Sequence, residues 1–351
     1  MEAIKNWLEL PEEQRKRYIG TIGIENGISS ETVEKDWWVT LVLRALFTSS
    51  FAEHISFKGG TSLSKCWNLI ERISEDVDIA INREFLGFDG ELSKTQISDK
   101  LRRASCSFVR ETMQSELGKR IVELGVQSSL FDVKVDITPI ITTDPEKIEV
   151  HYHSLLPPSN YVLNKVIVEV SGRSMSEPLE EITINSIISQ SLPNAKFADK
   201  LFPIKAVSPK RTFLEKAFLL HEEFAKEIKN IRIDRMSRHI YDLEKLMDTT
   251  IAQEALSNKE LYQAIIEHRC KFIGIKGFDY DTLMPQTISF VPPNKILSYW
   301  KDDYGRMQST MIYGESLTFD KLIERIKELN ERFRKIEITG GDSKRIVSAF
   351  Y

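Results

Sequence analysis

Residues 55–81 read ISFKGGTSLSKCWNLIERISEDVDIAI, and their pattern predicts one continuous strand–turn–helix–strand unit. Ile55 and Phe57 alternate with polar neighbours, as in a short half-buried strand. The paired glycines that follow, Gly59 and Gly60, allow a tight turn and a close approach of the backbone to a ligand. Apolar residues then recur at helical spacing, and from Arg72 the spacing changes to the period of two that is typical of a strand.

The predicted second strand carries polar side chains on one face. Arg72, Ser74, Asp76 and Asp78 are spaced two apart and point to one side, whereas Ile73, Val77, Ile79 and Ile81 point to the other. Asp76 and Asp78 therefore stand side by side, across from the glycine turn. Two carboxylates beside such a turn suit a divalent cation and the phosphates that it carries.

The composition is that of a soluble globular protein, with 41% hydrophobic and 28% charged residues. A length of 351 residues allows one large domain or two ordinary ones. The net charge of −4 argues against a basic coat but is compatible with a local basic groove. Three cysteines without a CxxC spacing indicate neither a disulfide framework nor a zinc site, and predict a reduced, cytoplasmic environment. We expect no signal peptide, since the first residues lack an apolar core, and no membrane span.

Two further stretches of the N-terminal half predict amphipathic helices, residues 30–47 and 97–124. In the first, Asp36 is expected to be a solvated acid beside Lys35. The polar side of the second carries six cations: Lys100, Arg102, Arg103, Arg110, Lys119 and Arg120. The spacing favours a solvated face with ion pairs over the alternative, a contact surface for nucleic-acid phosphates.

Two strands predicted after the second helix each place a carboxylate on a polar face. Asp136 lies in an alternating run over residues 131–137, and Glu169 lies in another over residues 166–171. Both are candidates for a third carboxylate near Asp76 and Asp78, although such positions are more often simply outward and polar. The proline-containing stretch between them, residues 142–160, predicts a loop.

A change in pattern divides the chain near residue 200. Residues 190–209 have little periodicity and three prolines, which predicts a domain boundary. We therefore expect an α/β domain with leading helices over residues 1–200 and a helical domain over residues 201–351. Lys216 and Asp242 lie in two of the predicted C-terminal helices.

The combination of motifs is more informative than any one of them. The glycine pair lacks the spacing of a P-loop or of a dinucleotide-binding fingerprint. The DxD at Asp76 does not follow an apolar strand directly, so it fits poorly with the aspartyl nucleophile of haloacid-type phosphatases. A Gly-Gly-Thr/Ser turn, one helix and a strand with Ser-x-Asp-x-Asp is instead the layout of the polymerase-β-like nucleotidyltransferase core.

The sequence also resembles a particular family within that superfamily, the AbiEii/AbiGii toxin nucleotidyltransferases. Six stretches carry the resemblance in the family's order: EKDWWVTLVLRALF (34–47), KGGTSLSK (58–65), RISEDVDIAI (72–81), RTFLEKAFLLHEE (211–223), SRHIYDLEKL (237–246) and DDYGRMQSTMIYGESLTFDKL (302–322). The resemblance implies a bilobed protein, with an α/β nucleotidyltransferase core, a small mixed sheet and a mainly α-helical C-terminal lobe that contributes to the active-site cleft.

The resemblance also implies roles for individual residues. Asp76 and Asp78 correspond to the family's metal-binding carboxylates, with Ser74 beside them, while Lys216 matches its lysine and Asp242 its downstream aspartate. Backbone N–H groups of the turn are then expected to bind phosphate, which gives a second set of candidates: Lys58, Gly59, Gly60, Thr61, Ser62 and Arg72.

Each of these charged residues also has a simpler interpretation. Asp242 lies four residues after Arg238, so a surface ion pair would explain it fully, and Lys216 could be a solvated helix residue. Lys58 and Arg72 either reach phosphate or pair with Glu71 and Glu75. If Asp242 does belong to the site, it either positions Lys216 or acts as base on the acceptor hydroxyl.

The function that the resemblance implies is transfer of a nucleoside monophosphate from an NTP to an acceptor hydroxyl, with Mg²⁺ as cofactor. The acceptor would be the 3′ end of tRNA, and the setting a bacterial toxin–antitoxin or phage-defence system with an antitoxin as partner. Three alternatives remain open: nucleotidylation of a protein or small molecule, phosphorylation with the same core, and a non-catalytic NTP-binding module.

Overall fold

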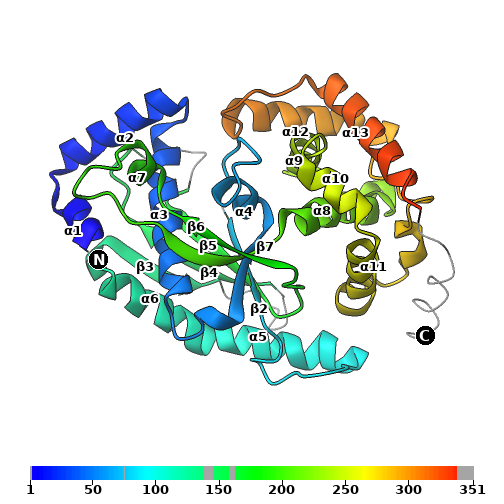
Figure 1. Cartoon of the computed structure of the whole chain (residues 1–351), viewed down its shortest axis with the longest axis horizontal. Coiled ribbons are helices and arrows are strands. Elements are labelled where there is room, and N and C mark those ends of the chain that lie inside the picture. The colour runs from blue at the N-terminus through cyan, green and yellow to red at the C-terminus, as the bar shows by residue number, and fades with distance from the viewer. Residues whose placement is uncertain (1, 75, 137–144, 158–162, 338–351) are drawn as a thin grey trace. The chain divides into compact units, whose positions relative to one another are not determined.

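The structure is a computed structural model that describes residues 2–74, 76–136, 145–157 and 163–337. Its strands form one seven-stranded sheet (Figure 1): β1 (Ile55–Lys58), β2 (Asp76–Ile81), β3 (Phe131–Val135), β4 (Glu146–Tyr152), β5 (Lys165–Ser171), β6 (Leu179–Ile184) and β7 (Phe202–Val207). Its α-helices are α1 (Glu2–Glu9), α2 (Glu12–Asn26), α3 (Ser30–Phe47), α4 (Gly59–Lys65), α5 (Arg102–Phe108), α6 (Gln114–Glu123), α7 (Ile187–Ser191), α8 (Pro209–Phe224), α9 (Ser237–Leu246), α10 (Thr250–Ser257), α11 (Lys259–His268), α12 (Leu297–Thr310) and α13 (Phe319–Arg334). None of these helices is both long and apolar enough to cross a membrane.

The chain folds into two compact units. The α/β unit comprises Met1–Trp67 and Ile73–Val207, and it contains the whole sheet. The helical unit comprises Asn68–Arg72 and Ser208–Tyr351. The sequence predicts the end of a helix and the start of a strand over residues 68–72, but α4 already ends at Lys65 and β2 begins at Asp76. Asn68 has φ +51°, a left-handed conformation that a helix does not contain, and Arg72 instead forms an isolated antiparallel bridge with Ile312 of the helical unit.

The sheet is mixed, as predicted, with strand order β3-β4-β5-β2-β1-β7-β6. Strand β2 pairs antiparallel with β1 and parallel with β5, so the DxD strand lies in the interior of the sheet. One face of the sheet is apolar: Val77 and Ile79 of β2 lie beside Val168 of β5, and all three are fully buried. Helix α3 covers this face, since its Val33 and Leu41 belong to the same buried cluster.

The sheet is larger than the small one predicted from the sequence, since β6 was not predicted and prolines obscured two further strands, β4 and β7. Strand β4 lies in the stretch predicted as a loop, where the prolines flank it, and its residues alternate between buried and half-buried. Strand β7 contains Pro203, which cannot donate to the ladder, and it lies in the stretch predicted as a domain boundary.

The predicted helices over residues 30–47 and 97–124 are confirmed, the second as a continuous run from Gln96 to Glu123. The solvated position expected for Asp36 is wrong. Its carboxylate accepts hydrogen bonds from the Lys65 ammonium and, at 2.6 Å, from the Ile187 N–H, and its side chain is only 12% exposed. On the second helix, Arg110 pairs with Glu146 at 2.9 Å, which supports the ion-pair interpretation of that face.

The helical unit has its own core, built mainly around α8 and α9. Phe213 and Phe218 of α8 are fully buried, and their rings lie 5.7 Å from Phe333 of α13 and 4.9 Å from Tyr262 of α11, centroid to centroid. These contacts pack the buried face of α8 against the other helices, and the same helix buries Lys216.

Candidate active site

The polar face of the sheet carries a row of charged residues across neighbouring strands. Asp78 of β2 is in register with Lys58 of β1 on one side and with Glu169 of β5 on the other. Cross-strand partners point to the same side of a sheet, so these three side chains share one face. Asp76 lies two residues before Asp78 on that face, opposite Ile167. The predicted side-by-side arrangement of the two aspartates is confirmed.

Gly59 is packed against Asp78 so closely that no side chain fits. It has φ +83°, and a Cβ atom built on it would lie 2.9 Å from Asp78 Cγ and closer still to Oδ2. Both the backbone conformation and the space therefore require glycine here. The sequence expectation of a tight turn and a close approach is correct, and the group that is approached is the Asp78 carboxylate.

Thr61 and Ser62 lie inside α4, and their hydroxyls are turned into the protein. The helix begins at Gly59, and its N-cap residue Lys58 makes no side-chain capping bond. Thr61 Oγ1 donates to the carbonyl of Asp76 and lies 2.6 Å from Ser74 Oγ. Ser62 Oγ donates to the Gly59 carbonyl at 2.9 Å. Both hydroxyls thus fix the turn and the start of β2, and direct binding of phosphate by them stays a prediction.

The register separates the two candidates for a third carboxylate. Glu169 is directly opposite Asp78, whereas Asp136 follows β3, three strands away from β2. With strands about 4.8 Å apart, Asp136 is about 14 Å from Asp78 along the sheet. Glu169 also pairs with Lys147 at 2.7 Å, and this bond, with Asp76 and Asp136 nearby, raises the pKa of Lys147. Glu169 is therefore the better placed of the two.

The carboxylate face suits a metal that is held partly by its substrate. Among the described residues, no three His, Cys, Asp or Glu side chains converge as a complete cation site. Mg²⁺ usually binds proteins through one or two carboxylates and takes further oxygens from substrate phosphates and water. Asp76 and Asp78, with the glycine turn beside them, fit this donor set.

The helical unit holds the remaining site candidates in one buried cluster, the Asp242 cluster, formed by Arg72, Lys216 and Asp242. Arg72 donates to Asp242 through Nε and Nη2, each at 2.7 Å, in a bidentate pair. Lys216 Nζ lies 2.8 Å from Asp242 Oδ2. Asp242 is fully buried, and Arg72 and Lys216 are only 3% and 7% exposed. Helices α8 and α9 thus bring two residues that are 26 positions apart in the sequence onto one carboxylate.

The charged groups of the Asp242 cluster shift one another's pKa values. Burial alone would raise the pKa of Asp242, but Arg72 and Lys216 outweigh it and hold this pKa well below its ordinary value. Burial, with repulsion from Arg72, lowers the pKa of Lys216 even though Asp242 opposes the shift. A carboxylate with so low a pKa is a weak base, which favours the positioning role for Asp242 over proton abstraction.

The simpler interpretations of these residues are wrong. Asp242 is not on the surface, and Arg238 forms no ion pair with it among the described side chains. Lys216 is buried rather than solvated, and Arg72 binds Asp242.

Sequence reasoning did not single out His239, which lies one turn before Asp242 on α9. Its Nδ1 is buried and makes no hydrogen bond to any described residue. Burial and the nearby Lys216 and Arg238 lower its pKa well below the ordinary value, so the ring is neutral at pH 7. His239 precedes Asp242 by three residues, so a helix places the two side chains near each other. A single histidine on a helix is nevertheless no signal for a functional residue.

One substitution tests the close packing of the turn. We expect Gly59→Ala to push Asp78 out of position and to lower nucleotide transfer by about 10²-fold, since displacements of about 1 Å have effects of this size. Gly87 has a similar positive φ of +84° but open space around it, so Gly87→Ala is the matched control for backbone strain alone. Equal transfer rates for the two variants would contradict the role given to Gly59.

A mixed sheet with paired carboxylates beside a glycine turn defines a nucleotidyltransferase-like class of site. Residues 41–325 match the family model "Nucleotidyl transferase AbiEii toxin, Type IV TA system". The match spans most of the chain, and the protein therefore belongs to the AbiEii family of nucleotidyltransferase toxins of type IV toxin–antitoxin systems. The resemblance seen in the sequence is confirmed.

The comparison with solved structures gives two similar chains. The chain is similar to MenT4, a nucleotidyltransferase toxin from Mycobacterium tuberculosis, with a TM-score of 0.52 and 14% identity over 94% of this chain and 92% of that one. It also matches JHP933 from Helicobacter pylori, with a TM-score of 0.41 and 12% identity over 88% and 93% of the two chains. No curated protein matches the sequence. At these identities MenT4 supports the fold alone.

Proposed function

We propose that this nucleotidyltransferase toxin is Mg²⁺-dependent and transfers a nucleoside monophosphate from an NTP to the 3′ end of tRNA. The observation that carries the proposal is the pair of carboxylates, Asp76 and Asp78, on an interior strand of the sheet. Gly59 packs directly against the Asp78 carboxylate, in space that a larger residue would fill. In the reaction, the acceptor oxygen forms a bond to the α-phosphorus of the NTP. The bond between that phosphorus and the oxygen that bridges the α- and β-phosphates breaks, and pyrophosphate leaves. The acceptor hydroxyl loses its proton to the surroundings.

Asp76 and Asp78 would hold the metal. When bound, Mg²⁺ would offset the negative charge that develops as pyrophosphate leaves. Ser74 is fixed beside this pair through Thr61, at 2.6 Å between their hydroxyl oxygens. Lys58 shares this face, and the backbone N–H groups of Gly59 and Gly60, which follow it at the start of α4, would bind phosphate oxygens.

Lys216 would neutralise phosphate charge, and Asp242 and Arg72 would position it. Lys216 is a point cation whose only carboxylate partner among the described residues is Asp242, so Asp242 fixes where its ammonium lies. The family resemblance, in which Lys216 and Asp242 match the downstream lysine and aspartate motifs, supports this role.

The choice of tRNA as acceptor rests on the family resemblance, and a cognate antitoxin is the expected protein partner. A transfer assay separates this acceptor from the alternatives. Incubation with each α-labelled NTP, total tRNA and a protein lysate should place the label on RNA, at its 3′ end, with release of pyrophosphate. Label on protein alone would contradict the tRNA proposal, and release of NDP would contradict nucleotidyl transfer. The Asp76→Asn variant controls for contaminating transferases.

A further inference from the structure

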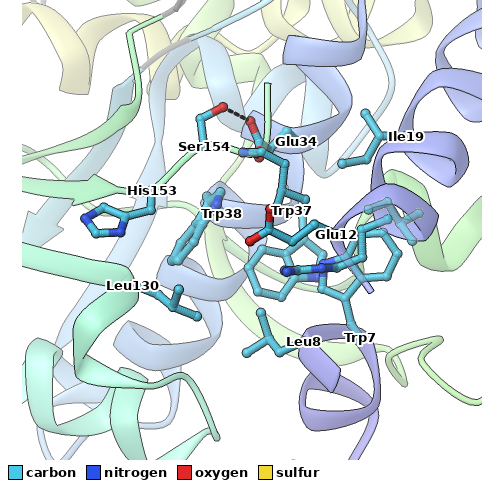
Figure 2. A pocket seen from close by; sticks show the side chains of 13 residues that line it. Trp7, Leu8, Glu12, Ile19, Glu34, Trp37, Trp38, Leu130, His153 and Ser154 are labelled. Carbon is cyan, nitrogen blue, oxygen red and sulfur yellow. Dashed lines mark hydrogen bonds between the residues drawn. The ribbon is translucent and has the colours of Figure 1, made fainter. Parts of the chain in front are cut away.

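The α/β unit contains a cavity of about 120 Å³ that the proposed reaction does not use. Figure 2 shows the side chains of Trp7, Trp37 and Trp38 around it, together with Glu12 and Glu34. An engineered apolar cavity of about 150 Å³ takes up benzene, so this one has the size for a single ring system. The three indoles that line it are at most 6% exposed, whereas Glu12 is an exposed residue.

Two charged residues that line the cavity, Glu34 and Arg15, are unfavourable where they lie: Glu34 is a buried carboxyl group, and Arg15 has an N–H without a hydrogen-bond acceptor among the described residues. Glu34 is 5% exposed and accepts hydrogen bonds from Ser154 Oγ at 2.5 Å and from the Leu155 N–H at 2.7 Å. Burial raises the pKa of Glu34 in spite of these bonds. Arg15, which also lines the cavity, has a buried Nε–H without a hydrogen-bond partner among the described residues. A buried guanidinium N–H without an acceptor is unfavourable, and a ligand with an acceptor would relieve it.

The charges restrict the kind of ligand. An anion would be repelled by Glu12 and Glu34, and a cation that pairs with these carboxylates would leave the Arg15 N–H without an acceptor. A purely apolar ring would leave the Arg15 N–H unsatisfied. A neutral, flat group with both carbonyl acceptors and N–H donors along its edge satisfies Arg15 and Glu34 together, and its faces can stack on indole rings. Nucleobases have these properties, and proteins read unstacked bases with aromatic, arginine and carboxylate side chains.

The register of the strands shows at which end of the sheet the cavity lies relative to Asp76, within the α/β unit. Asp76, Ile167 and Glu149 form one row across β2, β5 and β4. Strand β4 continues three residues beyond this row to Tyr152, and the cavity-lining residues Ser154 and Leu155 follow directly. The cavity is therefore at the end of the sheet where β2 begins, the end that carries Asp76.

We infer that this cavity binds an unstacked nucleobase of the acceptor RNA. The inference rests on the proposed function for the identity of the RNA, but base binding itself requires no transfer. Arg15 donates to a carbonyl or ring nitrogen of the base, Glu34 accepts from an N–H, and the tryptophans contact its faces.

Tryptophan fluorescence tests base binding directly, since three of the five tryptophans line the cavity. The full chain carrying Asp78→Asn, without Mg²⁺, is titrated with adenosine, guanosine, cytidine and uridine, which lack phosphates. At least one nucleoside should quench the fluorescence saturably, and Arg15→Gln should weaken that binding about tenfold, as expected for one charge-assisted hydrogen bond. Arg17→Gln, an exposed arginine on the same helix that does not line the cavity, should leave it unchanged.

The inference would be overturned if no nucleoside quenched the fluorescence saturably, or if the Arg15→Gln variant bound nucleosides as tightly as the protein with Arg15. It would also be overturned if N-acetylarginine amide quenched the fluorescence and nucleosides did not, which would indicate a protein side chain as the ligand. Circular dichroism melting of each variant controls for unfolding. In the transfer assay with otherwise unaltered protein, Arg15→Gln should raise KM for tRNA with little change in kcat, and an unchanged KM would contradict the acceptor as the source of the base. If the unaltered protein labels no RNA while nucleosides still bind, the proposed function fails and base binding stands.

Discussion

Asp78→Asn should lower the rate of pyrophosphate release from NTP by at least about 10³-fold. A bound metal contributes several kcal/mol to stabilising the charge of the transition state, and each 1.36 kcal/mol is a factor of ten in rate. Asn keeps the shape of the side chain beside Gly59 but removes its charge, so the substitution tests the carboxylate rather than the packing. The rate is measured with a coupled pyrophosphate assay over a range of Mg²⁺ concentrations.

The matched control is Asp136→Asn, the same substitution on an exposed carboxylate three strands away. We expect this variant to keep most of its activity and Glu169→Gln to lose more, because Glu169 is in register with Asp78. Unchanged pyrophosphate release by Asp78→Asn, or a greater loss in Asp136→Asn, would contradict the assignment of the metal site.

The second large effect is on stability. Asp242→Ala leaves the guanidinium of Arg72 and the ammonium of Lys216 buried without their shared carboxylate. Breaking a buried ion pair in this way destabilises proteins by about 3–5 kcal/mol. We expect a loss of this size in the unfolding free energy, measured by urea denaturation followed through the helical signal. Asp248→Ala is the control: Asp248 also pairs with two arginines, but its side chain is 61% exposed, and its loss should cost less than about 1 kcal/mol.

The same cluster predicts a dependence on pH. Because the pKa of Asp242 is depressed in the folded protein, the stability that it contributes is fully present above the unfolded pKa of about 3.9 and is lost as the pH falls toward the folded value. The stability difference between the unaltered protein and Asp242→Asn should be constant from about pH 7 to 5 and should shrink below about pH 4. A difference that grows on acidification would contradict the bidentate ion pair.

Lys216→Met separates stability from activity. It leaves the Arg72–Asp242 pair intact and keeps an unbranched side chain in a buried position. We expect it to unfold nearly as the unaltered protein does but to lose nucleotide transfer. A stable Lys216→Met variant with full activity would limit the Asp242 cluster to a structural role.

The carboxylate strand was predictable from the sequence because its periodicity is local. Alternation along β2 places Asp76 and Asp78 on one face whatever the rest of the chain does. The glycine pair was equally readable, although only the structure shows that Gly59 makes room for Asp78. What the sequence left open was register: nothing local says that Glu169 rather than Asp136 is opposite Asp78.

The burial of charged side chains was also not predictable from local sequence patterns. Charged residues such as Asp36, Lys216 and Asp242 are usually solvated, and the simpler interpretations followed that rule. All three instead have partners from other segments: Lys65 for Asp36, Asp242 for Lys216, and Arg72 for Asp242 across 170 positions. Strands β4 and β7 were missed because prolines beside or within them suggested loops. Long-range pairing decided each of these cases.

The most direct test of the central claim is sequencing of tRNA 3′ ends after induction of the protein in bacteria, with the Asp78→Asn variant as control. The proposed function predicts tRNAs that carry added nucleotides at their 3′ ends with the unaltered protein and none with the variant, together with growth arrest in the first case only. Unmodified tRNA 3′ ends in arrested cells, or identical additions with Asp78→Asn, would contradict nucleotidyl transfer to tRNA at the Asp76–Asp78 site.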